Sequence, residues 1–291
     1  MLRNWRDIQS LLYLGLAPFL VCWQWQHGFD GFAYALLLFL TLGVGVVNHN
    51  HAHLRMWGTR IANRLTDLWI ALLQGHPTYV FHCGHIANHH RYRHGERDLA
   101  RTYRFGSDSN DLAGYLLHPF QAASALYPEF LSWLARMRRY RPGVFRFCVL
   151  QYLLIAALWL SLLWVDWRKW LLFVFIPQLH GWHWLLATNY LQHAHADGNS
   201  DIDYARNFGG CLNPLLFNVG IHTAHHEKPR LHWSMLSQLH DNYRHRVDVR
   251  LAEPSLLLYM FRTYVLSLFL RKFRSRSMMS HSSLQHKNHT S

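Results

Sequence analysis

The stretch FAYALLLFLTLGVGVVNHNHAH, residues 32–53, decides the fold of this chain of 291 residues. Its first part, Phe32–Val47, is apolar throughout, and three histidines follow at positions 49, 51 and 53. An apolar helix of this kind suits the hydrocarbon core of a bilayer, which is about 30 Å thick. The stretch therefore predicts a transmembrane helix whose end delivers histidines to one membrane face.

Three further runs are free of charged residues and long enough to cross a membrane. They are Ile8–Trp25, Phe147–Val165 and Trp170–Thr188, and we expect Pro177 to kink the last one. Because the connectors after the first and third runs are short, the four helices should form two antiparallel hairpins. The histidines that follow the second and fourth helices are then expected on the same membrane face.

The distribution of arginine predicts which face that is. Twelve arginines lie in residues 55–143, between the two hairpins, whereas the connector after the first helix has neither Lys nor Arg. By the positive-inside rule the histidine-bearing face is cytoplasmic. The predicted fold is an all-α integral membrane protein of four transmembrane helices, with a cytoplasmic helical cap that carries the histidines.

The remaining segments complete this domain plan. We expect residues 1–270 to form a single membrane domain and residues 271–291 to be a basic, disordered tail. Residues 65–73 and 112–134 suit interfacial helices better than crossings, because they are short or interrupted by polar residues and proline. Ser255–Leu270 contains Arg262, and it is either an interfacial helix or a fifth crossing.

Composition excludes several other classes of protein. With 51% hydrophobic residues, 15% aromatic residues and four cysteines, the chain is neither disordered nor a disulfide scaffold. The formal net charge of +13 would suit a nucleic-acid partner, but most of the arginines follow membrane-length segments, where the positive-inside rule accounts for them. We therefore expect no nucleic-acid partner.

Histidine is the unusual residue of this chain, since 24 histidines outnumber the 16 acidic residues. Four clusters have the spacing of about one helical turn, which places their side chains on one side of a helix. They are His49 with His53; His85 with His89 and His90; Asn189 with His193; and His222 with His225 and His226. A nitrogen-only ligand set suits Fe, Zn, Cu or Ni, and the number of histidines fits two metals better than one.

Three of these clusters resemble the histidine boxes of the membrane fatty acid desaturase and hydroxylase superfamily. The matching residues are His49–His53, His85–His90 and His222–His226. The resemblance implies a non-haem di-iron centre whose ligands are eight histidines of the three boxes and His193 as an additional ligand: His49, His53, His85, His89, His90, His193, His222, His225 and His226. It also implies that Asn189 reaches a metal through water, and that O2 is the co-substrate.

The spacing of the boxes leaves the reaction open. Box two has three residues before its histidine pair, which is similar to alkane monooxygenases, whereas Phe217–Pro229 around box three is desaturase-like. We expect desaturation of a fatty acyl chain. The alternatives are hydroxylation of an alkane, fatty acid or carotenoid, and decarboxylation of a fatty acid to a terminal alkene. A membrane metal transporter and a structural membrane protein are rivals from other classes.

The predicted chemistry also implies partners. The substrate should be a lipid or an acyl chain on a carrier, and two electrons should come from an external donor of ferredoxin, rubredoxin or cytochrome type with its reductase. A ligating histidine usually donates its second ring N–H to a carboxylate or carbonyl. The candidate carboxylates lie close to the boxes in sequence: Glu96, Asp197, Asp201, Asp203 and Glu227.

Overall fold

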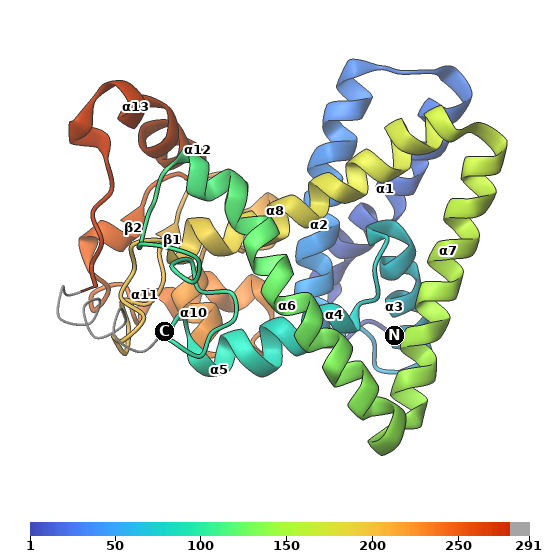
Figure 1. Cartoon of the computed structure of the whole chain (residues 1–291), viewed down its shortest axis with the longest axis horizontal. Helices are drawn as coiled ribbons and strands as arrows, with labels where there is room; N and C mark the ends of the chain where they lie inside the picture. Colours follow the sequence, from blue (N-terminus) through green and yellow to red (C-terminus); the bar gives the residue numbers. More distant parts are fainter. Residues whose placement is uncertain (280–291) are drawn as a thin grey trace. The chain divides into compact units, whose positions relative to one another are not determined.

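The computed structural model describes residues 1–279, which are predominantly helical (Figure 1). They divide into two compact units. The first unit contains residues 1–84 and 127–185, and the second contains residues 85–126 and the described residues from 186 onward. The chain therefore passes from one unit to the other three times, each time within a helix.

Helices dominate the chain as far as His193. Their bounds are α1 Ile8–His27, α2 Gly31–His53, α3 Arg60–Gln74, α4 Tyr79–Phe81, α5 His90–Tyr92, α6 Leu112–Tyr140, α7 Pro142–Trp170 and α8 Ile176–His193. Two π-helical stretches, His82–His89 and Leu171–Phe175, lead into α5 and α8, and a 3-10 turn, Trp5–Asp7, precedes α1.

Short elements follow α8 in the second unit. They are β1 Asn207–Phe208, α9 Leu212–Leu215, α10 His222–Glu227, α11 Leu236–Asp241, β2 Ala252–Glu253, α12 Leu256–Met260 and α13 Ser267–Phe269. A π-helical stretch, Phe261–Leu266, joins α12 to α13, and 3-10 turns occupy Trp233–Met235, Val249–Leu251 and Arg271–Phe273. The strands β1 and β2 pair in parallel, with Asn207 opposite Ala252.

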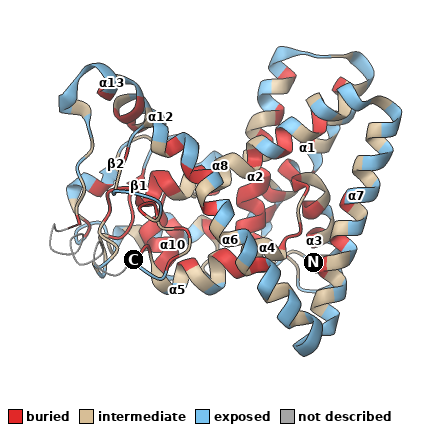
Figure 2. Cartoon of the chain, viewed as in Figure 1, coloured by how far each residue is buried: buried red, intermediate tan, exposed pale blue. Residues whose placement is uncertain are grey.

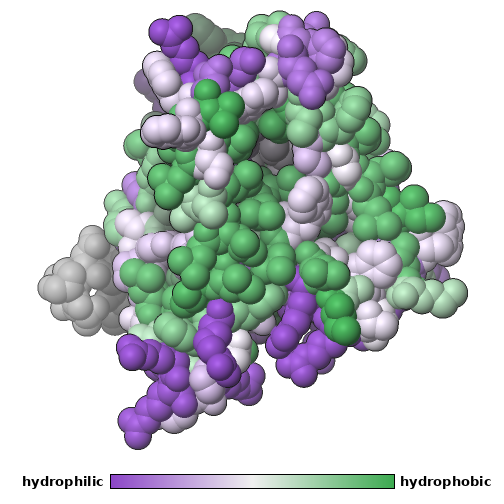
Figure 3. Space-filling view, turned by 90° about the vertical axis from the view of Figure 1, so that its right-hand side faces the viewer, coloured by the Kyte–Doolittle hydropathy of each residue, from purple (hydrophilic) through white to green (hydrophobic). Residues whose placement is uncertain are grey.

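Three helical segments of the described chain are long and apolar enough to cross a membrane: Trp5–His27, Gly31–His53 and Pro142–His193. The first two contain the runs predicted from the sequence. The third contains both later runs in one continuous segment of 52 residues. Its exposed side chains include Leu153, Leu160 and Trp164, and a broad hydrophobic surface on this side of the molecule lies between hydrophilic ends (Figure 3).

The predicted connector between those two runs is shorter than expected. Only Asp166 leaves the helical conformation, with φ −160° and ψ 99°. Its carboxylate accepts hydrogen bonds from the backbone N–H groups of Arg168 (3.0 Å) and Lys169 (3.1 Å), which caps the helix that restarts there. The irregularity expected at Pro177 takes the form of the π-helical stretch just before it, because proline has no N–H for the regular helical ladder.

Close packing and a cap define the first hairpin. Asp30 accepts a hydrogen bond from the N–H of Ala33 and so caps the start of α2. A Cβ on Gly43 would lie 2.1 Å from the ring of Tyr13, so only glycine lets α1 approach α2 this closely. At this point the backbone of α2 at Gly43 therefore packs directly against the ring of Tyr13 from α1.

The histidine-bearing end of α2 is fixed by a polar group in the first unit. His51 is buried, and its Nδ1 accepts a hydrogen bond from the N–H of Met56. The carboxylate of Asp67 pairs with Arg55 at 2.6 Å, and it lies 3.6 Å from Nε2 of His51. Burial raises the pKa of Asp67, and the charge of Arg55 opposes this shift. His51 thus serves the turn after α2, on a different side from His49 and His53.

The segment that follows α13 packs against the second unit. Of residues 271–291, for which we expected a disordered tail, the structure describes 271–279, and 280–291 lie outside the described residues. The N–H of Met278 donates to the carbonyl of His195, and Ser277 donates to Asp108 at 2.5 Å. Ser275 contacts Nδ1 of His195 at 2.9 Å. Residues 271–279 therefore belong to the second unit.

Candidate metal centre

A π-helix presents the second histidine box. His82–His89 forms this wider helix and α5 continues it, so His85, His89 and His90 follow one another at intervals of four and one. Because its hydrogen bonds run from i to i+5, a π-helix brings residues four and five positions apart to the same side, whereas an α-helix aligns residues three and four apart. Box two therefore converges despite its long spacing, and Nε2 of His85 lies 2.9 Å from Nε2 of His90.

Four histidines of the second unit form a group that we call cluster A: His89, His193, His222 and His226. Their candidate ligand nitrogens all lie within 4.8 Å of one another, and all four side chains are buried. The helix α10, which carries two of them, is mostly buried (Figure 2). They come from three separate elements: the second box, the end of α8, and α10. Nε2 of His222 lies 3.0 Å from Nε2 of both His193 and His226.

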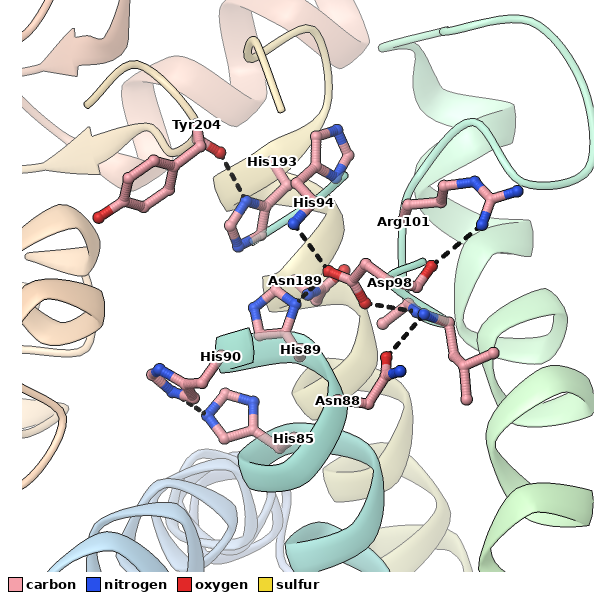
Figure 4. Close-up of polar contacts among 12 residues, drawn as sticks. His85, Asn88, His89, His90, His94, Asp98, Arg101, Asn189, His193 and Tyr204 are labelled. Carbon is pink, nitrogen blue, oxygen red and sulfur yellow. Dashed lines mark hydrogen bonds and ion pairs between the residues drawn. The ribbon is translucent and has the colours of Figure 1, made fainter. Parts of the chain in front are cut away.

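The outer nitrogens of two cluster A rings are engaged by acceptors (Figure 4). Nδ1 of His193 lies 2.7 Å from the carbonyl oxygen of Tyr204, and Nδ1 of His89 lies 2.6 Å from the carboxylate of Asp98. Both partners are acceptors, so each Nδ1 must carry the proton. In a neutral imidazole this leaves a lone pair on Nε2, the atom that faces the other rings.

These lone pairs fit a metal ion. Among the residues that the structure describes, Nε2 of His89 is buried without a hydrogen-bond partner. The single proton that His222 Nε2 can carry satisfies only one of its two contacts at 3.0 Å. Converging lone pairs repel one another unless a cation lies between them, and four imidazoles form a donor set of the kind that iron and neighbouring transition metals accept.

Asp98 is the carboxylate of this site. It is 0% exposed, and its Oδ2 accepts from His89 Nδ1 and from the N–H of His94 at 2.9 Å, while Oδ1 accepts from the N–H of Ala100 at 2.8 Å. Burial alone would raise the pKa of Asp98, but the nearby His89 ring and these hydrogen bonds hold it below its usual range. Asp98 thus places a negative charge directly behind the His89 ring.

Burial keeps the neighbouring imidazoles neutral, which is the form that binds metals. It lowers the pKa of His226 well below the usual value, and repulsion from other rings, led by His90, adds to this effect. It also lowers the pKa of His94 to about 3. The ring of His94 stacks on that of His193 at a centroid distance of 5.2 Å. His94 therefore supports cluster A by packing.

A second group of the same unit, cluster B, comprises His85, His90 and His225. Nε2 of His90 lies 2.9 Å from Nε2 of His85 and 3.0 Å from Nε2 of His225. In the first unit, His49 and His53 lie together at the end of α2, with ring centroids 4.8 Å apart. Cluster B is less buried than cluster A, because His85 and His90 are only half-buried.

Asn189 lies beside this histidine site on α8. Its side-chain oxygen lies 3.3 Å from Nε2 of His118, a buried residue of α6. Burial lowers the pKa of His118 to about 4, so the neutral ring donates its N–H to Asn189. This contact fixes the orientation of the Asn189 amide.

The predicted carboxylates have other partners. Glu227 accepts hydrogen bonds from the hydroxyl of Tyr204 (2.9 Å) and from Arg93 (3.1 Å), so it contacts the residue whose carbonyl holds His193. Asp197 accepts from the N–H of Asn199 in a turn, and Asp203 accepts from the N–H of Asp248. Glu96 and Asp201 are exposed.

Asp98, His94 and His118 were not predicted as site residues from the sequence. Asp98 lies nine residues after His89, and the chain returns to that ring through two left-handed residues, Arg93 (φ 45°) and His94 (φ 67°). Neither is a glycine, so the sequence carries no local signal for this turn. The one available signal is the acidic residue itself, close after a histidine box.

Comparison with protein families gives an independent result. Residues 23–254 match the family model described as fatty acid desaturase, which covers most of the chain and both histidine clusters. A comparison with curated proteins found no match.

Proposed function

Because the chain belongs to the fatty acid desaturase family, we propose that it is a membrane-bound, O2-dependent di-iron enzyme that introduces a double bond into a fatty acyl chain. The family itself indicates an oxidoreductase of the desaturase and hydroxylase type. The observation that supports the finer proposal is the convergence of the four buried cluster A imidazoles, two of which have Nε2 left as a lone pair by their Nδ1 contacts.

The two clusters provide two ligand sets. In our proposal cluster A holds one iron and cluster B holds the other. The resemblance of His49 and His53 to the family's first histidine box supports them as further metal ligands. The bound irons would supply the O2 activation that breaking an unactivated C–H bond requires, since no side chain offers that chemistry. Two external electrons would come from a ferredoxin, rubredoxin or cytochrome-type donor.

The protein's own groups prepare this site. Asp98 and the carbonyl of Tyr204 hold the protons on Nδ1 of His89 and His193, which keeps both Nε2 atoms as donors to metal. His118 orients Asn189, which in our proposal holds a water molecule next to the metals. Burial of the four cluster A rings excludes bulk water from a site that handles a strong oxidant.

We further propose four crossings with the histidines on the cytoplasmic face. At about 1.5 Å per residue, the 52-residue segment Pro142–His193 is more than twice as long as a hydrocarbon core of about 30 Å. The break at Asp166 divides it into two helices of crossing length. The acyl chain would then reach the metals from within the bilayer.

Hydroxylation is the second candidate, because box two has the spacing H-x-x-x-H-H. Removal of two adjacent hydrogens from the chain gives an alkene, whereas transfer of one oxygen atom gives an alcohol. The placement of the acyl chain against the metals decides between these products.

Product analysis tests the proposal. A host that expresses the chain is fed deuterated fatty acids, and His226→Ala at matched expression serves as the inactive control. Loss of two hydrogens with the full chain alone would support desaturation. Gain of one oxygen would replace it with hydroxylation, and loss of the carboxyl carbon would indicate decarboxylation. Protein that binds no iron after purification from iron-replete cells would refute all three.

A further inference from the structure

The segment Leu256–Phe269, which contains α12 and α13 (Figure 1), has its apolar face outward and its polar face inward. Its ribbon carries both buried and exposed residues (Figure 2). Its exposed side chains are hydrocarbon: Leu257 (59%), Leu258 (55%), Phe261 (51%), Val265 (41%), Leu268 (58%) and Phe269 (79%). Its buried side chains all carry a hydroxyl: Tyr259, Thr263, Tyr264 and Ser267. A helix on a water-facing surface has the opposite arrangement.

The inward face is fixed by specific contacts with the second unit. The hydroxyls of Tyr259 and Tyr264 bond to the two ends of the Asn110 amide, at 2.6 Å and 3.1 Å. The guanidinium of Arg206 lies 4.7 Å from the ring centre of Tyr259. The segment cannot turn its apolar face inward without breaking these bonds, so its outer face needs a partner of its own.

The outer face carries no uncompensated charge. Arg262 is the one charged residue in Leu256–Phe269, and its guanidinium pairs with Glu253 at 2.6 Å. An apolar face of this size without free charge is costly in water. It matches the acyl region of a lipid leaflet.

Length and flanking charge decide how the segment meets lipid. At about 1.5 Å per residue Leu256–Phe269 extends roughly 21 Å, which is too short for a core of about 30 Å. Immediately after it come four exposed basic residues: Arg271, Lys272, Arg274 and Arg276. Basic residues beside an apolar helical face are attracted to anionic headgroups.

We propose that Leu256–Phe269 lies within a single leaflet as an interfacial helix, with its outer face among acyl chains and residues 271–276 at anionic lipid headgroups. The segment thereby anchors the histidine-bearing second unit to the membrane through its own lipid contact. This anchoring is independent of the reaction that the histidines perform, so the two proposals stand or fall separately.

Depth measurements on the full chain in lipid nanodiscs test the proposal. The exposed cysteines are first removed as Cys22→Ser and Cys211→Ser. Spin labels are then placed one at a time by Leu258→Cys, Phe261→Cys and Phe269→Cys, and their collisions with O2 and with a water-soluble nickel chelate are compared. Arg244→Cys is the water-exposed control.

We expect all three labels to favour O2 over the nickel chelate and to report the same shallow depth, whereas the Arg244→Cys label favours nickel. A depth that increases to the bilayer centre along the segment would show a fifth crossing and overturn the proposal. Preference for nickel at the three sites would place the segment in water. Protection from both reagents would place a second protein surface there.

A charge series tests the headgroup contact. In nanodiscs that contain phosphatidylglycerol, the Phe269→Cys label should lie deeper than in pure phosphatidylcholine. Neutralising the four basic residues together, as Arg271→Gln, Lys272→Gln, Arg274→Gln and Arg276→Gln, should remove most of that difference. If depth in the parent chain does not depend on phosphatidylglycerol, recognition of anionic headgroups is refuted.

Discussion

Replacing Asp98 by asparagine should weaken one metal site and spare the other. Asp98 accepts three hydrogen bonds, two at Oδ2 from His89 Nδ1 and His94 N–H and one at Oδ1 from Ala100 N–H. An amide has a single oxygen, so in Asp98→Asn an NH2 group must face at least one N–H donor. The buried mismatch should lower the free energy of unfolding by about 1–3 kcal/mol.

The effect on metal binding follows from which ring is involved. Loss of the carboxylate frees His89 to change its tautomer and orientation, and partners of this kind are typically worth about 10–100-fold in metal affinity. His89 belongs to cluster A, whereas cluster B takes its histidines from other positions. Under competition with a chelator, Asp98→Asn should therefore keep about one metal per chain where the unmodified protein keeps about two.

The assay counts metal per chain against increasing chelator and records thermal unfolding in the same detergent. Asp248→Asn is the matched control, because Asp248 also accepts a backbone N–H, from Arg250, but in an exposed turn of the same unit. If Asp98→Asn remains folded and loses metal no earlier than Asp248→Asn, the assignment of Asp98 to His89 is refuted. Equal loss from both sites would indicate general destabilisation instead.

Three further changes probe other parts of the chain. Gly43→Ala should lower the free energy of unfolding by about 1–3 kcal/mol, because the added Cβ would meet the Tyr13 ring. Gly15→Ala is the control, because a Cβ at Gly15 has open space around it and should not destabilise the protein. Thermal unfolding of the two variants in detergent measures the difference. The metal-free protein should lose stability as the pH falls from about 6.5 to 4. The pKa of His118 is about 4 in the folded state and about 6.5 in the unfolded chain, so the unfolded chain binds the proton first as the pH falls. His118→Gln should reduce that loss, by at most about 3 kcal/mol at pH 4, in unfolding measurements across this range; equal acid sensitivity would contradict it. Deleting Ala87 should convert the π-helical second box to an α-helical one, and the protein should largely retain its metal. Deleting Ala187 from α8 should rotate His193 away from cluster A, so the metal of cluster A should be lost. Counting metal ions per chain distinguishes the two variants.

The apolar helices could be predicted because a long run of apolar residues is visible in the sequence without knowledge of which residues it contacts. The runs 8–25 and 32–47 lie within α1 and α2, and the later pair lies within Pro142–His193. The predicted connector, residues 166–169, was too long. A single residue, Asp166, both interrupts the helix and caps its continuation. This double role of Asp166 depends on where its carboxylate lies, which a hydropathy pattern does not show.

The region around box three was less predictable. Phe217 and Asn218 adopt left-handed backbone conformations with φ of 56° and 55° just before His222. The turn is held by hydrogen bonds: the N–H of Asn218 donates to the carbonyl of Asn213, and the side-chain amide of Asn218 donates to the carbonyl of Trp233 at 3.1 Å. Asn218 is of a type that adopts this conformation readily, but Phe217 is not, so residue type alone does not signal two such residues in succession.

The π-helix at box two changes what its spacing says about the reaction. Three residues between His85 and His89 would place His90 off the common side of an α-helix. The same long spacing is the feature that is similar to alkane monooxygenases and that left the reaction open. In the π-helix the extra residue is absorbed by the wider turn, and His85, His89 and His90 still converge. The long box therefore presents the same three imidazoles that a shorter box presents on an α-helix. The spacing keeps hydroxylation as the second candidate without changing the ligand set, and in our proposal the placement of the acyl chain against the metals decides between alkene and alcohol.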